Sequence, residues 1–139
     1  MTLRIVLDTN VLISGLLSAH GPPAQLLDLA LTGELALLLD DRILAEYREV
    51  TQRPRFGFSQ ADVARAVDAL AVIAEHVAAP PLAVNLPDPG DLPFLEVAAA
   101  GGADALVTGN RRHFATVRGR HHVRICAPRE LLDTLRGSR

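Results

Sequence analysis

Apolar and polar residues follow one another along the chain in blocks that predict strands and helices in turn. Residues 3–7 form a short run of leucine and β-branched residues that predicts a strand, and residues 34–39 predict a second one. Between them, residues 11–19 and 23–32 have helical character, and Gly33 follows as a stop signal. A strand, a helical crossover and another strand are typical of a βαβ unit.

Two further helices are predicted, at about residues 42–52 and 60–77, from apolar residues at helical spacing. Asp40-Asp41 and Ser59 stand where the N-caps of these helices belong. Residues 85–93, rich in Pro, Asp and Gly, then predict a turn-rich loop.

The last third repeats the alternation. The run FLEVAAAGGADALVTGN (94–110) predicts a helix, a Gly-Gly stop, a strand and a turn, and a short helix is expected near residues 111–115. A strand at about 122–126 and a terminal helix begun by Pro128 complete the pattern. Because nearly all strands are continuously apolar, we expect an α/β fold, a three-layer sandwich with a mainly parallel central sheet covered by helices on both faces.

Length and composition favour one compact unit. The chain has 139 residues, of which 49% are hydrophobic and 22% charged, so we expect a single domain spanning residues 1–139. No apolar run approaches the ~18 residues of a membrane span, and no leader pattern precedes residue 3, so a cytoplasmic protein is expected. The lone Cys126 lies between apolar neighbours and is interpreted as a buried small hydrophobe.

The charges are unevenly distributed and all basic side chains except histidine are arginine. Residues 1–110 hold 6 arginines against 14 acids, whereas residues 111–139 hold 8 arginines against 2 acids. The absence of lysine excludes a Walker-type phosphate loop, a Schiff-base enzyme and a lysine-activated serine hydrolase.

Acidic residues stand where a parallel sheet would gather them at one edge. Asp8 follows the first strand, Glu46 lies one turn into the helix after the second, and Asp88 and Asp91 open a later helix. In such sheets ligands bind beside the carboxyl ends of the strands. Clustered carboxylates repel one another unless a cation neutralises them, and Mg²⁺ or Mn²⁺ prefers carboxylate oxygen. The pattern therefore favours phosphate chemistry at a hard divalent metal.

Each of these residues also has a purely structural interpretation. Asp8 alone fits a helix cap as well as a ligand, although Asn10 could take the cap instead. Glu46 alone would favour a surface ion pair with Arg42. Asp88 and Asp91 suit a turn and a helix cap, and Thr108-Gly109-Asn110 suits a turn. Their joint placement favours the functional interpretation.

Four segments together resemble the PIN-domain family, and specifically the VapC-like toxins of bacterial toxin-antitoxin pairs. They are VLDTNVLISGLL (6–17), EYREV (46–50), DPGDLPFLEVAAAGGADALVTGN (88–110) and the pair RRHF and VRICAPRELLDTL in the last 29 residues. The resemblance implies a small α/β/α domain and a metal-dependent ribonuclease that hydrolyses RNA phosphodiester bonds with Mg²⁺ or Mn²⁺. It also implies an antitoxin partner and a homodimer.

Carried over residue by residue, the resemblance implies that Asp8, Glu46 and Asp91 are catalytic and that these three bind metal with Asp88. Asn110 stands where many members have a fourth acid, which leaves the choice between one and two metal ions open. The supporting residues would orient the acids and their waters, and they are Thr9, Asn10, Thr108 and Asn110.

The arginine-rich end suits a polyanionic substrate. The candidate RNA-binding residues are Arg111, Arg112, Arg118 and Arg120, with Arg124 beside them, although a solvated surface is the other interpretation. His113, His121 and His122 are interpreted as exposed polar residues or RNA contacts, because their spacing does not suit a zinc site. With 4% aromatic residues and no Trp, base stacking is poorly provided for.

Three other classes of protein place an acid or a PIN-like fold in a comparable way. A haloacid-dehalogenase-like phosphatase and a response-regulator receiver both need a lysine that the chain lacks. The third is a catalytically weak PIN-like module that binds RNA or a partner protein, with Asn110 as the sign of lost activity.

Overall fold

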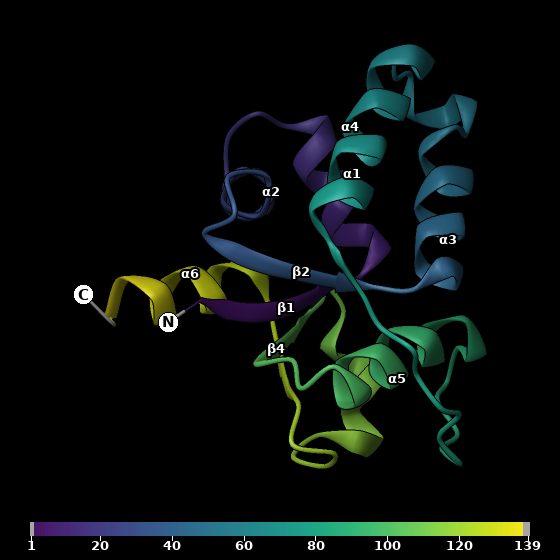
Figure 1. Ribbon diagram of the computed structural model, residues 1–139, viewed down its shortest axis with the longest axis vertical. Helices are drawn as coiled ribbons and strands as arrows, with labels where there is room; N and C mark the ends of the chain where they lie inside the picture. Colours follow the sequence, from purple (N-terminus) through teal and green to yellow (C-terminus); the bar gives the residue numbers. More distant parts are fainter. Residues whose placement is uncertain (1, 138–139) are drawn as a thin grey trace.

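The computed structural model describes residues 2–137, and its centre is a five-stranded sheet in which all strands run parallel (Figure 1). The strands lie in the order β3-β2-β1-β4-β5, so the first strand of the chain is the central one. The strands are β1 Leu3–Leu7, β2 Leu35–Leu39, β3 Glu75–His76, β4 Ala105–Val107 and β5 Arg124–Cys126. The expected α/β fold with a parallel central sheet is confirmed.

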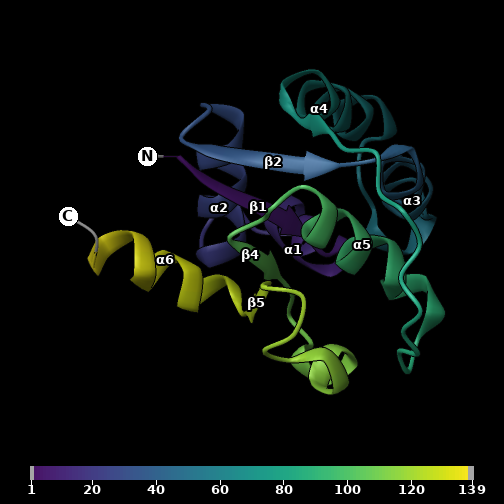
Figure 2. The same cartoon turned by 60° about the horizontal axis from the view of Figure 1, so that its bottom comes forward.

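Helices cover both faces of the sheet and make the expected three layers. The α-helices are α1 Thr9–Leu17, α2 Pro22–Leu31, α3 Asp41–Thr51, α4 Gln60–Ile73, α5 Leu92–Ala100 and α6 Pro128–Gly137. The short 3-10 helices are η1 Pro54–Phe56, η2 Pro89–Asp91 and η3 Arg111–Val117. Helices α1, α2 and α4 lie above the sheet in Figure 1 and α5 lies below it, while Figure 2 shows α5 in front of β1 and β4.

The strand order reverses beside β1. From β1 the chain crosses to β2 on one side, and it reaches β4 on the other side only after passing through α5 on the opposite face. The ends of the two strands are in register, with Leu7 paired to Val107. Ligands of open parallel sheets bind where the strand order reverses, which directs attention to the residues that follow Leu7 and Val107.

Apolar strand residues account for the stability of this centre. Ile5, Val6 and Leu7 are completely buried, as are Leu106 and Val107 on the neighbouring strand. Burying a side chain of this size contributes about 1.5–3 kcal/mol, so the central strands provide a rigid base for the polar residues at their ends.

The predicted stop and cap signals lie at the ends of the helices. The Asp40 carboxylate accepts a hydrogen bond from the Ile43 backbone N–H at 3.0 Å, which caps α3, and Ser59 caps α4 through the Asp62 N–H. Gly33 adopts a φ of 82° between α2 and β2, a conformation that L-amino acids with a side chain rarely adopt.

One predicted boundary is wrong. The helix expected over residues 60–77 ends at Ile73, and Glu75–His76 form β3, whose two residues pair with Leu38 and Leu39 of β2. Both β3 residues are exposed and polar, so the apolar pattern that marks a buried strand is absent there.

The long segment between β3 and η2 is held by one buried carboxylate. Glu96 on α5 is only 3% exposed, and it accepts hydrogen bonds from the Leu82 backbone N–H at 2.7 Å and from Arg42 at 2.6 Å. Arg42 thereby links the first turn of α3 to α5. Within the described part of the chain, no helix has the length and apolar character needed to cross a membrane.

Candidate functional site

Two residues directly after the central strands form the base of the site. Asp8 follows β1 and Thr108 follows β4, and the Thr108 hydroxyl donates a hydrogen bond to Asp8 Oδ2 at 2.7 Å. The two strand ends are also joined by the Asp8 backbone N–H, which donates to the Val107 carbonyl at 2.9 Å. Both side chains are buried, and the Thr108 hydroxyl fixes one oxygen of the Asp8 carboxylate.

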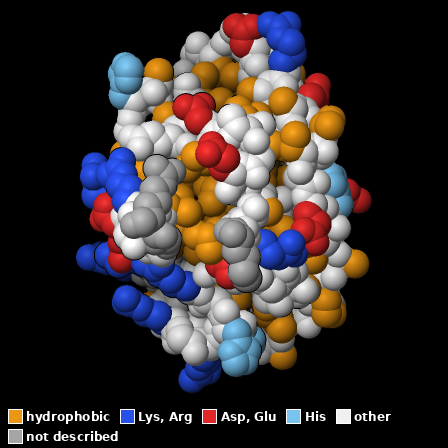
Figure 3. Space-filling model, turned by 60° about the vertical axis from the view of Figure 1, so that its left-hand side comes forward, with side chains coloured by type: hydrophobic (Ala, Val, Ile, Leu, Met, Phe, Trp, Pro, Cys, Tyr) orange, Lys and Arg blue, Asp and Glu red, His pale blue; other side chains and the backbone are white. Residues whose placement is uncertain are grey.

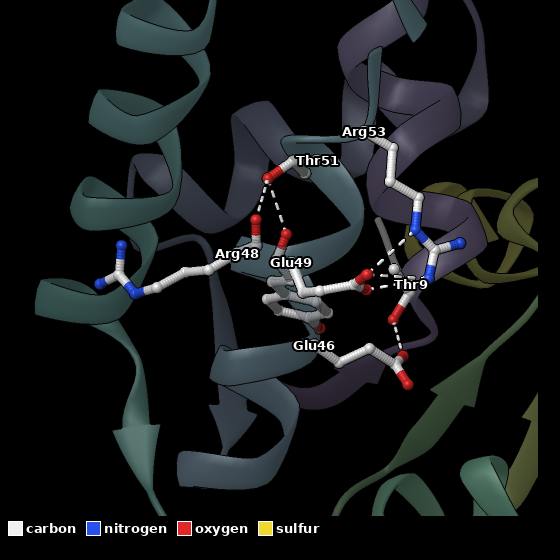
Figure 4. Close-up of polar contacts among 7 residues, drawn as sticks. Thr9, Glu46, Arg48, Glu49, Thr51 and Arg53 are labelled. Carbon is white, nitrogen blue, oxygen red and sulfur yellow. Dashed lines mark hydrogen bonds and ion pairs between the residues drawn. The ribbon is translucent and has the colours of Figure 1, made fainter. Parts of the chain in front are cut away.

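Helix α3 brings Glu46 to this strand end. The fully buried Tyr47 donates its hydroxyl to the Leu7 carbonyl, which ties α3 to the last residue of β1. On the adjacent position, Glu46 accepts a hydrogen bond from the Thr9 hydroxyl (Figure 4). The possible ion pair between Glu46 and Arg42 is not formed, because Arg42 bridges Asp40 and Glu96 instead.

The two acids before α5 have different surroundings. Asp88 accepts a hydrogen bond from the Gly90 backbone N–H at 2.9 Å, so it takes the structural turn role that the sequence offered to either acid. Asp91 is 8% exposed and makes no side-chain cap. Its Oδ2 lies 2.9 Å from His113 Nδ1, but not in the alignment of a hydrogen bond, and this buried oxygen has no hydrogen-bond donor among the described residues.

These acids surround one hollow of about 450 Å³ at the carboxyl end of the sheet. We call it the acid hollow. Its lining residues are Asp8, Thr9, Asn10, Ile13, Ser14, Glu46, Val50, Arg53, Arg55, Phe56, Asp88, Gly90, Asp91 and His113. The hollow therefore gathers the four acids that the sequence assigned to metal binding, together with cationic and aromatic side chains that it did not.

Burial and mutual repulsion make the negative charges costly. Burial raises the pKa of the Asp8 carboxyl, against the lowering effect of the Thr108 hydroxyl and, more weakly, of the Thr9 backbone N–H. Burial, followed by repulsion from Asp8 and Asp88, raises the pKa of Asp91 to about 6, and His113 opposes this rise. Both groups would be stabilised in the charged form by a cation placed between them.

Comparison with models of known protein families identifies the family of this chain. The model of the PIN domain matches residues 4–112, which is most of the chain and includes all four acids. The chain belongs to the PIN-domain family.

Solved structures show the same PIN-domain fold. A chain in the crystal structure of VapBC2 from Rickettsia felis, bound to a DNA fragment from their promoter, superposes with a TM-score of 0.57. The match covers 88% of this chain and 98% of that chain at 16% sequence identity, so it concerns the fold. Among curated proteins, no sequence matches significantly.

The acidic side chains of the acid hollow do not lie close enough together to coordinate a metal ion. Among residues 2–137, no three His, Cys, Asp or Glu side chains are grouped so that they could hold a metal ion as they stand. The donor set nevertheless fits a hard divalent cation, because its members are carboxylates and Asp91 keeps one buried oxygen without a donor. Binding would require the acid side chains to draw closer together.

The cap assigned to Asn10 is wrong. Helix α1 begins at Thr9, so Asp8 itself occupies the N-cap position, but its carboxylate makes no capping hydrogen bond. Asn10 lies in the first turn and lines the acid hollow. Asp8 can thus begin the helix through its backbone while its side chain faces the site.

Asn110 and His113 are joined, which the sequence did not predict. The Asn110 Nδ2 lies 2.9 Å from His113 Nε2, and His113 is half-buried against Asp91 instead of being an exposed polar residue. An amide that donates to Nε2 leaves the proton of a neutral imidazole on Nδ1, which faces Asp91. A histidine three residues after an asparagine is an ambiguous signal in sequence, because only the 3-10 turn of η3 brings the two side chains together.

The arginines that reach the acid hollow are not the predicted ones. Arg53 and Arg55 line it, whereas Arg111 pairs with Glu130 at 3.0 Å on the outer surface. Three of the predicted RNA-binding residues are exposed: Arg112 lies within η3, and Arg118 and Arg120 follow it. Arg53 and Arg55 lie in the acidic part of the sequence, where the charge count gave no reason to select them.

A second hollow, of about 540 Å³, lies between α2 and α6 and lacks this chemistry. Figure 3 shows hydrophobic side chains gathered on this face of the molecule. Its apolar lining is formed by Leu29, Leu35, Leu132 and Leu135, and its acids Asp28 and Glu34 are exposed. Buried polar groups of unusual pKa occur in the acid hollow, so size alone does not mark the functional site.

Proposed function

We propose that the protein is a metal-dependent endoribonuclease and the toxin of a toxin-antitoxin pair. The observation that carries this proposal is the meeting of Asp8, Glu46, Asp88 and Asp91 in one hollow beside the reversal of strand order. Burial raises the pKa of both Asp8 and Asp91, and a bound cation would offset the cost of holding these charges together.

The proposed metal is Mg²⁺ or Mn²⁺, held by Asp8, Glu46 and Asp91 with Asp88 at the edge. Such an ion would polarise the RNA phosphodiester and activate a water for attack on it. All four ligands are oxygen donors, which suits these ions better than zinc.

The neighbouring side chains hold the acids in place. Thr108 holds Asp8 and Thr9 holds Glu46, each through one hydroxyl, which leaves other carboxylate oxygens free to bind. Asn110 carries no charge and its amide faces His113, so the proposed site has one carboxylate fewer than a site with aspartate there. His113 lies 2.9 Å from Asp91 and opposes the rise in the pKa of that carboxyl.

The toxin assignment rests on likeness. The chain belongs to the PIN-domain family and shares its fold with a chain of the VapBC2 structure, which is described with promoter DNA. We propose by analogy an antitoxin that covers the acid hollow, a homodimer and a cytoplasmic location.

The test is cleavage of RNA by the purified protein. We expect an end-labelled single-stranded RNA to be cut with Mg²⁺ or Mn²⁺ and to stay intact with EDTA. Asp8→Asn should reduce the cleavage rate by about 100-fold or more, because a charged ligand is replaced by a neutral one. The matched control is Asp28→Asn, which changes an exposed acid in the other hollow and should cleave like the parent.

A catalytically weak RNA-binding module is the second candidate, and Asn110 at the place of an acid favours it. The two functions differ in one result. If RNA binds but is not cut with either metal, and Asn110→Asp restores cleavage, the module interpretation replaces the enzyme. Equal cleavage by parent and Asp8→Asn would show that the acid hollow is not the nuclease site.

A further inference from the structure

The rim of the acid hollow carries an aromatic ring and an arginine that the acids do not use. Phe56, the last residue of η1, is half-buried and lines the hollow together with Arg55. The Arg55 guanidinium carbon lies 4.7 Å from the centroid of the Phe56 ring. Phe58 stacks on the same ring, with centroids 5.8 Å apart and planes at 30°, and itself packs against the core. Phe58 therefore anchors Phe56 at the rim.

Arg55 differs from the other arginines around it. Arg53, two residues earlier, is held by Glu49 at 2.9 Å (Figure 4), and Arg48 is held by Asp68 at 2.6 Å. In the described part of the chain Arg55 has no carboxylate within ion-pair distance, and its contact is the Phe56 ring. Its charge is therefore available to an anion that enters the hollow.

A flat ring beside an available cation matches the repeating unit of single-stranded RNA. Each nucleotide presents one planar base and one phosphate, and aromatic rings stack bases of any sequence. A guanidinium binds phosphate through two parallel N–H groups. A cation over an exposed ring contributes less than a stacked base does, so exchange of one for the other is favourable.

We propose that Phe56 and Arg55 form a nucleotide-binding shelf on the acid hollow. An unpaired base replaces the guanidinium over the Phe56 ring, and Arg55 turns to the adjacent phosphate. This inference rests on the proposed ribonuclease function, because the shelf and the acids share one hollow. It revises the expectation, drawn from the low aromatic content, that base stacking is poorly provided for.

A base on the shelf fits better than a partner protein. The side chain of Arg55 would repel a basic segment attracted by the acids, whereas it favours a phosphate that approaches them. The strand would have to be single-stranded or looped, because a base inside a duplex cannot leave the stack without cost.

The chain offers a direct probe, since it contains no tryptophan. Phe56→Trp introduces the only indole, and Asp8→Asn in the same chain prevents cleavage while Mg²⁺ is present. We expect hexa-adenylate to quench the indole fluorescence on binding. A hexamer of the same length with abasic sugars keeps its phosphates and should leave the fluorescence unchanged.

Affinity measurements separate the ring from the charge. In the Asp8→Asn chain, Phe56→Leu should weaken binding of labelled hexa-adenylate by about tenfold and leave binding of the abasic hexamer unchanged. Arg55→Ala should weaken both by about three- to tenfold, because a phosphate contact is lost from each. The matched control is Arg65→Ala on α4, an exposed arginine away from the hollow, which should change neither.

Two results would overturn the shelf. Equal loss of affinity for both hexamers in Phe56→Leu, with an unchanged urea midpoint, would mean that the ring only supports Arg55. Unchanged binding of both hexamers by Phe56→Leu would mean that RNA does not reach the rim. If the Phe56→Leu variant then also failed to stay bound to a co-expressed antitoxin, the ring would be assigned to a protein partner. All binding is measured without cleavage, so a protein that fails as a nuclease can still bind at the shelf.

Discussion

The negative charge of Asp91 is unfavourable in the folded chain, because the side chain is buried beside Asp8 and Asp88. An aspartate titrates near pH 3.9 in an unfolded chain, and burial with repulsion from Asp8 and Asp88 raises the pKa of Asp91 to about 6 in the folded one. The folded state therefore holds this proton more tightly than the unfolded state. The contribution of Asp91 to the free energy of unfolding is therefore fully present below the pKa of the unfolded chain. It is lost as the pH rises through the pKa of the folded chain.

We therefore predict a pH-dependent difference between parent and Asp91→Asn in the presence of EDTA. The variant should have the larger free energy of unfolding at pH 7.5, by about 1–3 kcal/mol, and this advantage should vanish near pH 4. Urea denaturation at half-unit steps of pH measures it. Asp28→Asn, at an exposed position, should show no such trend, and a constant difference for Asp91→Asn would contradict the assignment.

Single residues also show where prediction from sequence ends. The strand-end position of Asp8 follows from the pattern, because a polar residue after a buried strand must lie at the sheet edge. His113 could not be selected in that way. Its position beside Asp91 depends on how η3 and η2 pack against each other. Neither of these short 3-10 helices has a periodic pattern of apolar residues that would predict this packing from the sequence.

At the scale of elements, the fold was predictable where apolar periodicity is strong. The buried strands and the capped helices lie close to their expected limits, because burial and caps leave residue patterns. The edge strand β3 was missed, since two exposed polar residues pair only through their backbones. The sequence likewise did not predict that Arg55 and Phe56 belong to the site, because only the packing of α3 brings their short loop close to the acids.

The hydrogen bond from Tyr47 on α3 to the Leu7 carbonyl of β1 leads to a prediction about stability. Tyr47→Phe should lower the free energy of unfolding by about 1–3 kcal/mol, because it leaves the buried Leu7 carbonyl without the tyrosine hydroxyl. Thr51→Val is the control, since the Thr51 hydroxyl bonds only carbonyls of its own helix and should cost less. Urea denaturation provides both values. RNA cleavage should fall with Tyr47→Phe as well, as Glu46 loses its fixed distance from the strand end.

On the scale of the whole molecule, charge is divided between an acidic hollow and an arginine-rich end. Exposed arginines that track an RNA backbone act through the release of counterions, so their effect depends on salt. Arg118 and Arg120 flank Gly119 on the surface, and neither is held in an ion pair within residues 2–137.

We predict that Arg118→Ala with Arg120→Ala lowers the salt dependence of RNA binding. The slope of log affinity against log salt should decrease by about 1.4, or about 0.7 for each phosphate contact with a single strand. Fluorescence anisotropy of a labelled RNA at several NaCl concentrations measures this slope. Arg65→Ala should leave it unchanged, and an unaltered slope in the double variant would assign these arginines to the solvated surface.

The hydrogen bond between Thr108 and Asp8 joins residues 100 positions apart in the chain. A ribosome that has made β1, α3 and the loop with Phe56 has not yet made the strand that completes the floor of the acid hollow. The nascent chain thus remains without a finished site until β4 has emerged and taken its place beside β1. For a protein proposed to cleave RNA, this order of assembly postpones activity until the ribosome has made the chain through β4.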